Sequence, residues 1–387
     1  MRAKLPGLKD VIAARRAVGA ACALGISLGA LLVPGGSLVG VAQGAECPGT
    51  VPADSHQVAS QALSSDAYRH AHRFADGTGV TVAVIDTGVE AHPRLKLHPD
   101  NEAGDCQAHG TIVAGVIAAH DNGDGVVGVA PGAEILGIRQ AGDQRREDTA
   151  GTIATLVEAI DTAIERDVDV INISVVACVP QDQSLEHTPL DQVIKKAEAR
   201  GIVMVAAAGN LGGPCTEHSQ ALPAAHPLVV GVGATSDERT LAAYSMPVQG
   251  GALSAPGQVL AAIDPRSSGL ASATTSYNST AAFEGTSFAA PLISGTFALL
   301  RQRYPEASPA ALRAMLYHSV DPNTGVVDPL RSLTFRHEPA QQHQIHLAAR
   351  SPVVTQGWNK LLLLLLGFGL LGIVLVALRG TERRHEN

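Results

Sequence analysis

The stretch Gly285-Thr286-Ser287-Phe288-Ala289-Ala290-Pro291 places a serine between small residues, just ahead of a long apolar run over residues 289–300. This run predicts a buried helix with Ser287 in its first turn, where backbone N–H groups are free and the partial charge is positive. Pro291 is tolerated there because the first turn needs no internal N–H donor. The free N–H groups and the positive partial charge would both stabilise an anion forming beside the serine oxygen. Taken alone, Ser287 could also be an ordinary helix N-cap.

Outward from this helix, β-branched runs alternate with apolar helical segments. The clearest strand covers residues 80–85, ends at Asp86-Thr87-Gly88, and precedes a predicted helix over residues 112–119. Such alternation predicts an α/β fold with a mainly parallel central sheet and helices on both faces, whose functional groups gather at the strands' carboxyl ends. The other predicted strands are 126–129, 135–138, 168–176, 202–208 and 229–232, and the other predicted helices are 152–166, 190–200 and 309–318.

The two ends of the chain predict export and membrane anchoring. Residues 1–45 have a basic start, an apolar run and small residues near Ala45, the pattern of a secretory signal peptide; an uncleaved anchor is the alternative. Residues 361–378 carry no charge and are long enough to span a hydrocarbon core. Arginines follow this run, which predicts a cytoplasmic tail and a main domain outside the cell.

Charge and cysteine content restrict the function further. The chain has 28 Lys and Arg against 36 Asp and Glu, an acidic balance that makes nucleic-acid binding a poor prediction. Cys22 lies in the signal segment, and the even number of remaining cysteines in an exported domain predicts two disulfides with three possible connectivities. We expect no metal site: residues 121–125 could offer oxygens to calcium, but a surface turn is the simpler interpretation.

Three short stretches supply groups for nucleophilic catalysis: Asp86-Thr87-Gly88, His109-Gly110-Thr111 and Gly285-Thr286-Ser287. A serine nucleophile needs a base, which His109 can be, and the histidine needs a carboxylate such as Asp86 to fix its tautomer. Asn210, after the strand at 202–208, can donate its amide to an oxyanion beside the Ser287 N–H. The glycines of these stretches would let chain segments approach closely.

The order Asp, His, Ser with these flanking residues resembles the subtilisin-like serine proteases over about residues 80–316. The resemblance implies a three-layer sandwich, endopeptidase activity on proteins or peptides, and no cofactor. Residues 170–178 look like the substrate-binding strand of the mycosin branch. Val176 stands where many subtilases have glycine, so we expect a narrower groove. The substrate-binding residues that the resemblance implies are Ser174, Val175, Val176, Ala207, Ala208 and Gly209.

The layout is similar to that of the mycosins, membrane-anchored proteases of actinobacterial type VII secretion systems. In mycosins a short N-terminal extension wraps around the catalytic domain and is held by a disulfide. The resemblance therefore implies the disulfides Cys47–Cys106 and Cys178–Cys215. It also implies subunits of a secretion complex as partners. The chain departs from the mycobacterial pattern in being short and in lacking a long proline-rich linker. Two alternatives stay open: a mainly structural subunit of the secretion complex, and a general extracytoplasmic protease.

These observations predict six regions along the chain. They are a signal peptide (1–45), an N-terminal extension (46–78), a subtilisin-like peptidase domain (79–328), a linker (329–359), one transmembrane helix (360–379) and a cytoplasmic tail (380–387).

Overall fold

The computed structural model describes residues 47–140, 151–237, 240–247, 253–276, 279–321 and 324–335, all within one compact unit. Within these ranges no helix is long and apolar enough to cross a membrane. The predicted signal peptide (1–45) and transmembrane helix (360–379) lie outside the described residues.

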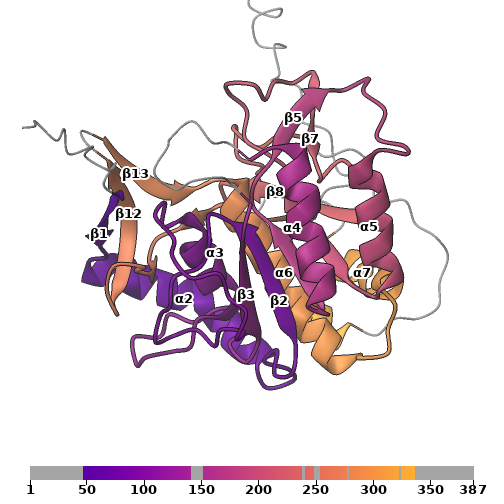
Figure 1. Ribbon diagram of the computed structural model, residues 1–387. Coiled ribbons are helices and arrows are strands. Elements are labelled where there is room, and N and C mark those ends of the chain that lie inside the picture. The colour runs from indigo at the N-terminus through magenta and orange to yellow at the C-terminus, as the bar shows by residue number, and fades with distance from the viewer. Residues whose placement is uncertain are drawn as a thin grey trace, which may run out of the picture. The chain divides into compact units, whose positions relative to one another are not determined.

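A parallel sheet of six strands forms the centre of the described unit (Figure 1). Its strands, in spatial order, are β3 (Glu134–Arg139), β2 (Thr81–Asp86), β4 (Val170–Ile173), β6 (Val203–Ala207), β8 (Val229–Thr235) and β9 (Leu253–Pro256). Strands such as β6 are buried along their whole length, as expected when helices cover both faces. The predicted α/β class with a parallel sheet is confirmed.

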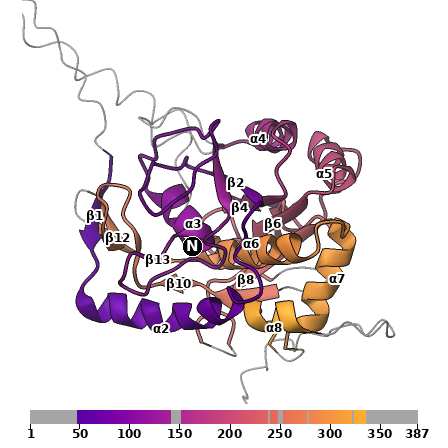
Figure 2. The ribbon, with the colours of Figure 1, turned by 90° about the horizontal axis from the view of Figure 1, so that it is seen from below.

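Two helix layers enclose the sheet (Figure 2). On one side, α4 (Ile153–Glu165) and α5 (Pro189–Ala199) each bury one apolar stripe in a shared core with the strands. On the other side, α3 (His109–Ala118) and α6 (Thr286–Arg303) are buried nearly all round. The long apolar run after Ser287 therefore forms a central helix rather than a surface one.

A second, antiparallel sheet lies beside this core and was not predicted. Its order is β1-β12-β13-β10, with β11 (Ala262–Ile263) pairing with β12. The strands are β1 (Gly49–Pro52), β12 (Leu270–Ser276), β13 (Ser279–Glu284) and β10 (Gln258–Val259). Since β13 ends one residue before Gly285, this sheet leads directly into the turn that carries Ser287.

The N-terminal extension is structured, although its sequence shows little periodicity. After β1 comes α2 (Ser55–Ala71), which Asp54 and Gln57 open with a reciprocal capping box. Figure 2 shows α2 outside the layer of α3 and α6. Gln61 Oε1 accepts a hydrogen bond from the backbone N–H of Leu260 at 2.9 Å, and β1 pairs with β12. Strand pairing and single polar contacts thus help to hold the extension.

Two predictions about the chain's course are wrong. Residues 126–129 form no strand, because the backbone N–H groups of Gly128 and Val129 donate to carbonyls of Ala119 and Val116 at the end of α3. The second concerns the start of the linker at 329. There the chain forms α8 (Pro329–Thr334), which contacts α2 and α6 and buries Leu333, so the folded region continues past residue 328. Before it, α7 (Pro309–Ser319) occurs where a helix was predicted.

Candidate active site

The carboxyl end of β2 and the first turns of α3 and α6 meet at one edge of the parallel sheet. Asp86 ends β2, His109 begins α3, and Ser287 is the second residue of α6. His109 Nδ1 lies 2.7 Å from Asp86 Oδ1, and His109 Nε2 lies 3.0 Å from Ser287 Oγ. When Nδ1–H donates to the carboxylate, Nε2 is free to accept the serine proton. The geometry is that of a nucleophile, a base and an orienting carboxylate.

The charge balance around His109 favours its protonated form. The Asp86 side chain is fully buried, whereas that of His109 is 28% exposed. Burial lowers the pKa of His109, but the negative charge of Asp86, the hydrogen bond to it and the charge of Asp105 together raise that pKa above its usual value. An imidazolium formed by proton transfer from serine is therefore stabilised.

A second buried carboxylate, Asp105, lies beside Asp86 and the start of α3 and was not singled out from the sequence. Its Oδ1 accepts from Thr87 Oγ1 at 2.7 Å, and its Oδ2 accepts from the N–H and Oγ1 of Thr111 at 2.8 and 2.7 Å. Thr87 Oγ1 in turn accepts from the Gly110 N–H at 3.0 Å, and the Thr87 N–H donates to Asp86 Oδ1 at 2.7 Å. Asp105 thereby ties the loop after β2 to the first turn of α3. Burial chiefly, and the charge of Asp86, raise the pKa of Asp105.

Two glycines permit the close contact between these segments. A β-carbon on Gly110 would overlap the carbonyl oxygen of Gly88. Gly88 itself has a φ of 104°, and a β-carbon there would overlap the carbonyl oxygen of Gly104. The sequence-based expectation of close approach is met at both positions.

Asn210 is held in a defined orientation by the residue before the serine. Its Oδ1 accepts from the backbone N–H and the Oγ1 of Thr286 at 3.0 and 3.1 Å, and Thr286 Oγ1 accepts from the Gly209 N–H at 3.1 Å. These bonds occupy the amide oxygen and leave Nδ2 as the donor facing the turn at Gly285. Thr286 is only 1% exposed, so its part in orienting Asn210 is a role that the sequence analysis missed.

A series of buried hydrogen bonds connects the backbone of Ser287 to β4 and to the next turns of α6. Ser174 Oγ donates to the Ser287 carbonyl at 3.0 Å and accepts from Asn172 Nδ2 at 2.9 Å. Ser294, two turns along α6, donates to Asn172 Oδ1 at 2.8 Å. That Ser174 binds substrate stays a prediction; its hydroxyl donates to the backbone of Ser287.

The other predicted groove residues follow the ends of β4 and β6. The predicted strand 168–176 ends at Ile173, and Val175 and Val176 beyond it are partly exposed. Ala207, Ala208 and Gly209 are buried. Ala208 lines a cavity of about 80 Å³ together with residues of β7 (Ser219–Leu222), which pairs with β5 (Ala177–Pro180). That these residues bind substrate stays a prediction.

Both disulfides have the pairing that the resemblance implies. Cys47–Cys106 has a Cα–Cα distance of 4.9 Å, and Cys178–Cys215 has one of 5.2 Å. Beside the first, the Arg266 guanidinium donates to the carbonyls of Asp105 at 3.0 Å and Cys106 at 2.6 Å. The extension is thus fixed directly next to the Asp105 network.

The acidic turn at residues 121–125 is engaged with the protein itself. Asp121 Oδ1 accepts the N–H groups of Gly123 and Gly125 at 2.9 and 3.0 Å, and the carboxylate of Asp124 pairs with Arg94 at 2.8 and 2.9 Å. In the described part of the chain no group of three or more His, Cys, Asp or Glu side chains is placed to hold a metal ion.

Comparison with known proteins agrees with this geometry. Residues 77–345 match the model of the Subtilase family. Mycosin-1 of Mycobacterium tuberculosis is 33% identical, with 81% of this chain and 83% of that protein covered, and Subtilisin BL of Lederbergia lenta is 32% identical, with 62% and 83% covered. Among solved structures, MycP1 with its N-terminal propeptide removed has a TM-score of 0.65 at 31% identity, covering 72% of this chain and 98% of that chain. The chain therefore belongs to the subtilase family of serine endopeptidases and resembles the mycosins within it.

Proposed function

We propose that Ser287 is the nucleophile of peptide-bond hydrolysis through an acyl-enzyme. The observation that carries this proposal is the position of His109, hydrogen-bonded between Asp86 and Ser287 at 2.7 and 3.0 Å. His109 takes the proton of Ser287 Oγ as the oxygen attacks the substrate carbonyl, then gives it to the leaving amine. Asp86 keeps the imidazole oriented. Asn210 Nδ2 and the Ser287 N–H donate to the oxyanion, and water releases the acyl group by the same proton transfers in reverse.

Labelling with a fluorophosphonate probe tests the nucleophile. The wild-type chain should be labelled on Ser287, and Ser287→Ala should not be labelled while keeping its thermal unfolding midpoint. Ser184→Ala removes an exposed serine that is distant from Ser287 in the sequence. It is the matched control and should label like wild type. A folded wild-type protein that takes up no label would contradict the mechanism.

The same proposal includes the cellular arrangement. The signal-peptide pattern at 1–45 and the uncharged run at 361–378 support a single-pass membrane protein whose catalytic domain is extracytoplasmic and cleaves secreted proteins. Alkaline phosphatase, which is active only after export, should be active when fused after residue 335 and inactive when fused after residue 387. Activity of both fusions would contradict the predicted topology.

A second role, as a structural subunit of a type VII secretion membrane complex, has its own support. A solved intact ESX-5 inner membrane complex contains a chain with a TM-score of 0.65 at 28% identity, covering 88% of this chain and 94% of that chain. Secretion and complex assembly should be compared in a deletion strain complemented with wild type or with Ser287→Ala. Full rescue by Ser287→Ala would make the structural role dominant. Cleavage of denatured casein would favour a general protease instead.

A further inference from the structure

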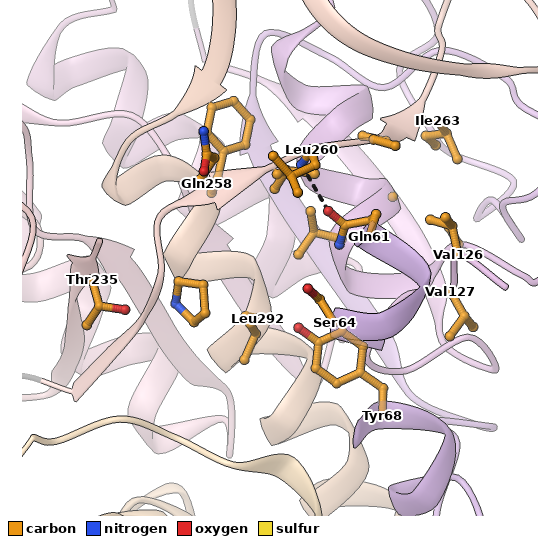
Figure 3. Close-up of a pocket in the computed structure, with 18 of the residues that line it drawn as sticks. Gln61, Ser64, Tyr68, Val126, Val127, Thr235, Gln258, Leu260, Ile263 and Leu292 are labelled. Carbon is orange, nitrogen blue, oxygen red and sulfur yellow. Dashed lines mark hydrogen bonds between the residues drawn. The ribbon is translucent and has the colours of Figure 1, made fainter. Parts of the chain in front are cut away.

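A cavity of about 420 Å³ lies beneath the N-terminal extension, between α2, α3, α6 and the segment that contains β10 and β11 (Figure 3). Gln61, Ser64 and Tyr68 reach it from α2, and Leu292 reaches it from α6. Neither Ser287 nor His109 lines it, so it is separate from the catalytic groups. Its volume is in the range of small-molecule binding sites.

The lining of this cavity favours an uncharged occupant with an apolar body. Aliphatic side chains form most of the wall, and the larger ones include Val116, Val126, Val127, Leu260, Ile263 and Leu292. No Lys, Arg or His is among the lining residues, and Asp237 is the only acid among them. A carboxylate ligand would therefore lose its hydration without gaining a cation, and such burial of an unpaired charge is strongly unfavourable.

Three polar side chains of the cavity lie together on α2, and the other polar lining residues, Thr235, Ser236, Asp237 and Gln258, come from other segments. In Figure 3 the hydroxyl of Tyr68 points into the cavity close to Ser64, and it forms no hydrogen bond with any residue that the structure describes. Burial first, and the nearby charge of Asp328, raise the pKa of Tyr68 far above its usual value, so the hydroxyl stays protonated. Gln61 Oε1 is engaged by the Leu260 N–H, which leaves the amide Nε2 as a donor. One end of an apolar cavity thus offers neutral donors and acceptors.

The cavity also contacts the catalytic histidine through one aromatic ring. Phe288 lines the cavity, follows Ser287 in α6, and is 6% exposed. The centroid of its ring lies 5.1 Å from that of the His109 ring. A molecule packed against Phe288 would restrict the ring that borders the catalytic base.

We propose that this cavity binds an uncharged single-chain amphiphile, with its aliphatic tail against Leu292 and Phe288 and its hydroxyl group against Tyr68 and Gln61. Occupancy restricts Phe288 and so changes the turnover rate. Binding itself requires none of the catalytic roles proposed above. It is therefore measured on the full chain carrying Ser287→Ala, so that its failure and a failure of the catalytic proposal are distinguishable.

Titration calorimetry with two probes of equal chain length tests the chemistry: 1-decanol below its solubility limit in water and decanoate below its critical micelle concentration. We expect saturable binding of 1-decanol and at least about tenfold weaker binding of decanoate, since its carboxylate would meet no cation on the lining. Tyr68→Phe, which keeps the ring, should weaken 1-decanol binding about fivefold through loss of one hydrogen bond. Absence of 1-decanol binding, or tighter binding of decanoate, would overturn the proposal.

Two blocking variants and one control locate the site. Ala119→Leu adds volume to the cavity wall directly after α3 and should abolish binding. If that variant does not fold, Ser64→Leu serves instead, because Ser64 combines exposure with a place on the lining. Leu63→Ser, on the same helix but 78% exposed and not on the lining, should bind like its parent. Unchanged binding in the blocking variants would overturn the site, and unchanged kcat of the wild type with bound 1-decanol would overturn the coupling through Phe288.

Discussion

The catalytic edge of the parallel sheet and the N-terminal extension are held in different ways. Asp86, His109 and Ser287 sit at the ends of elements that are buried on nearly every side. The extension has few buried residues of its own, and α2 buries only Ser65 and Ala71. It is attached by a disulfide, by pairing of β1 with β12 and by single polar contacts. We infer that the sheet edge determines catalysis and that the extension mainly determines stability.

The sharpest test of this division is Ser287→Ala. Removing the nucleophile should lower kcat by about 10⁶-fold, because serine and histidine act as one unit in such a site. The free energy of unfolding should hardly change, since Ser287 Oγ bonds only to His109 among the described residues. Kinetics on a peptide substrate and urea unfolding measure the two effects. A strongly destabilised variant would mean that the serine also holds the fold.

Breaking either disulfide should have its largest effect on the free energy of unfolding. Cys47–Cys106 joins residues that are 59 positions apart in the sequence, and Cys178–Cys215 joins residues that are 37 positions apart. Replacing both cysteines of either pair by serine should lower the free energy of unfolding by up to about 4 kcal/mol. Loss of Cys47–Cys106 should leave KM unchanged, whereas loss of Cys178–Cys215 should raise it, because β5 and β7 lie beside Val176, which we predict to bind substrate.

Urea unfolding and steady-state kinetics on the two double variants make this comparison. A large fall in kcat after loss of Cys47–Cys106, in a protein that is still folded, would break the division. It would show that the extension takes part in catalysis through its neighbour Asp105.

Asn210→Ala should lower kcat by about 10²- to 10³-fold, because one oxyanion donor is lost. Thr286→Val should cause a smaller loss, because it removes the hydroxyl that bonds to Asn210 and Gly209. Thr286→Ser keeps that hydroxyl and should be close to wild type. Equal effects of the Val and Ser variants on kcat would mean that the hydroxyl does not orient the amide.

The smallest expected effect is a shift of the pH profile in Asp105→Asn. The charge of Asp105 contributes to the raised pKa of His109, so its removal should lower that pKa. His109 acts as a base only when neutral, and the acid limb of kcat/KM should therefore move to lower pH. Asp100→Asn, which alters an exposed carboxylate paired with Arg166, is the control. An unmoved limb in Asp105→Asn would show that Asp105 has only a structural role.

The residues of the candidate site were predictable where the signal is local. Asp86, His109, Asn210 and Ser287 each follow a strand or begin a helix whose type is evident from a short apolar run. Parallel strands bring their carboxyl ends to one edge, so the sequence also predicted that these residues would meet. The structure brings Asp86, His109 and Ser287 within hydrogen-bonding distance and turns Asn210 toward them.

What the sequence could not predict depends on partners distant along the chain. Thr286 and Asp105 look like ordinary polar residues until folding places Asn210 and Thr87 against them. The valines of residues 126–129 suggest a strand, yet their backbone is satisfied by carbonyls of α3. For α2 the Asp54–Gln57 capping box was the one usable signal, because a helix with few buried positions has no clear apolar periodicity.

The Cys47–Cys106 disulfide makes a covalent ring that contains α2, β2 and Asp86. A single peptide-bond cut anywhere inside this ring leaves one covalent molecule, heavier by one water. Release of the extension therefore requires two cuts, or one cut together with reduction of the disulfide. A nicked protein would migrate as the intact chain under non-reducing conditions and as two fragments once the disulfide is reduced.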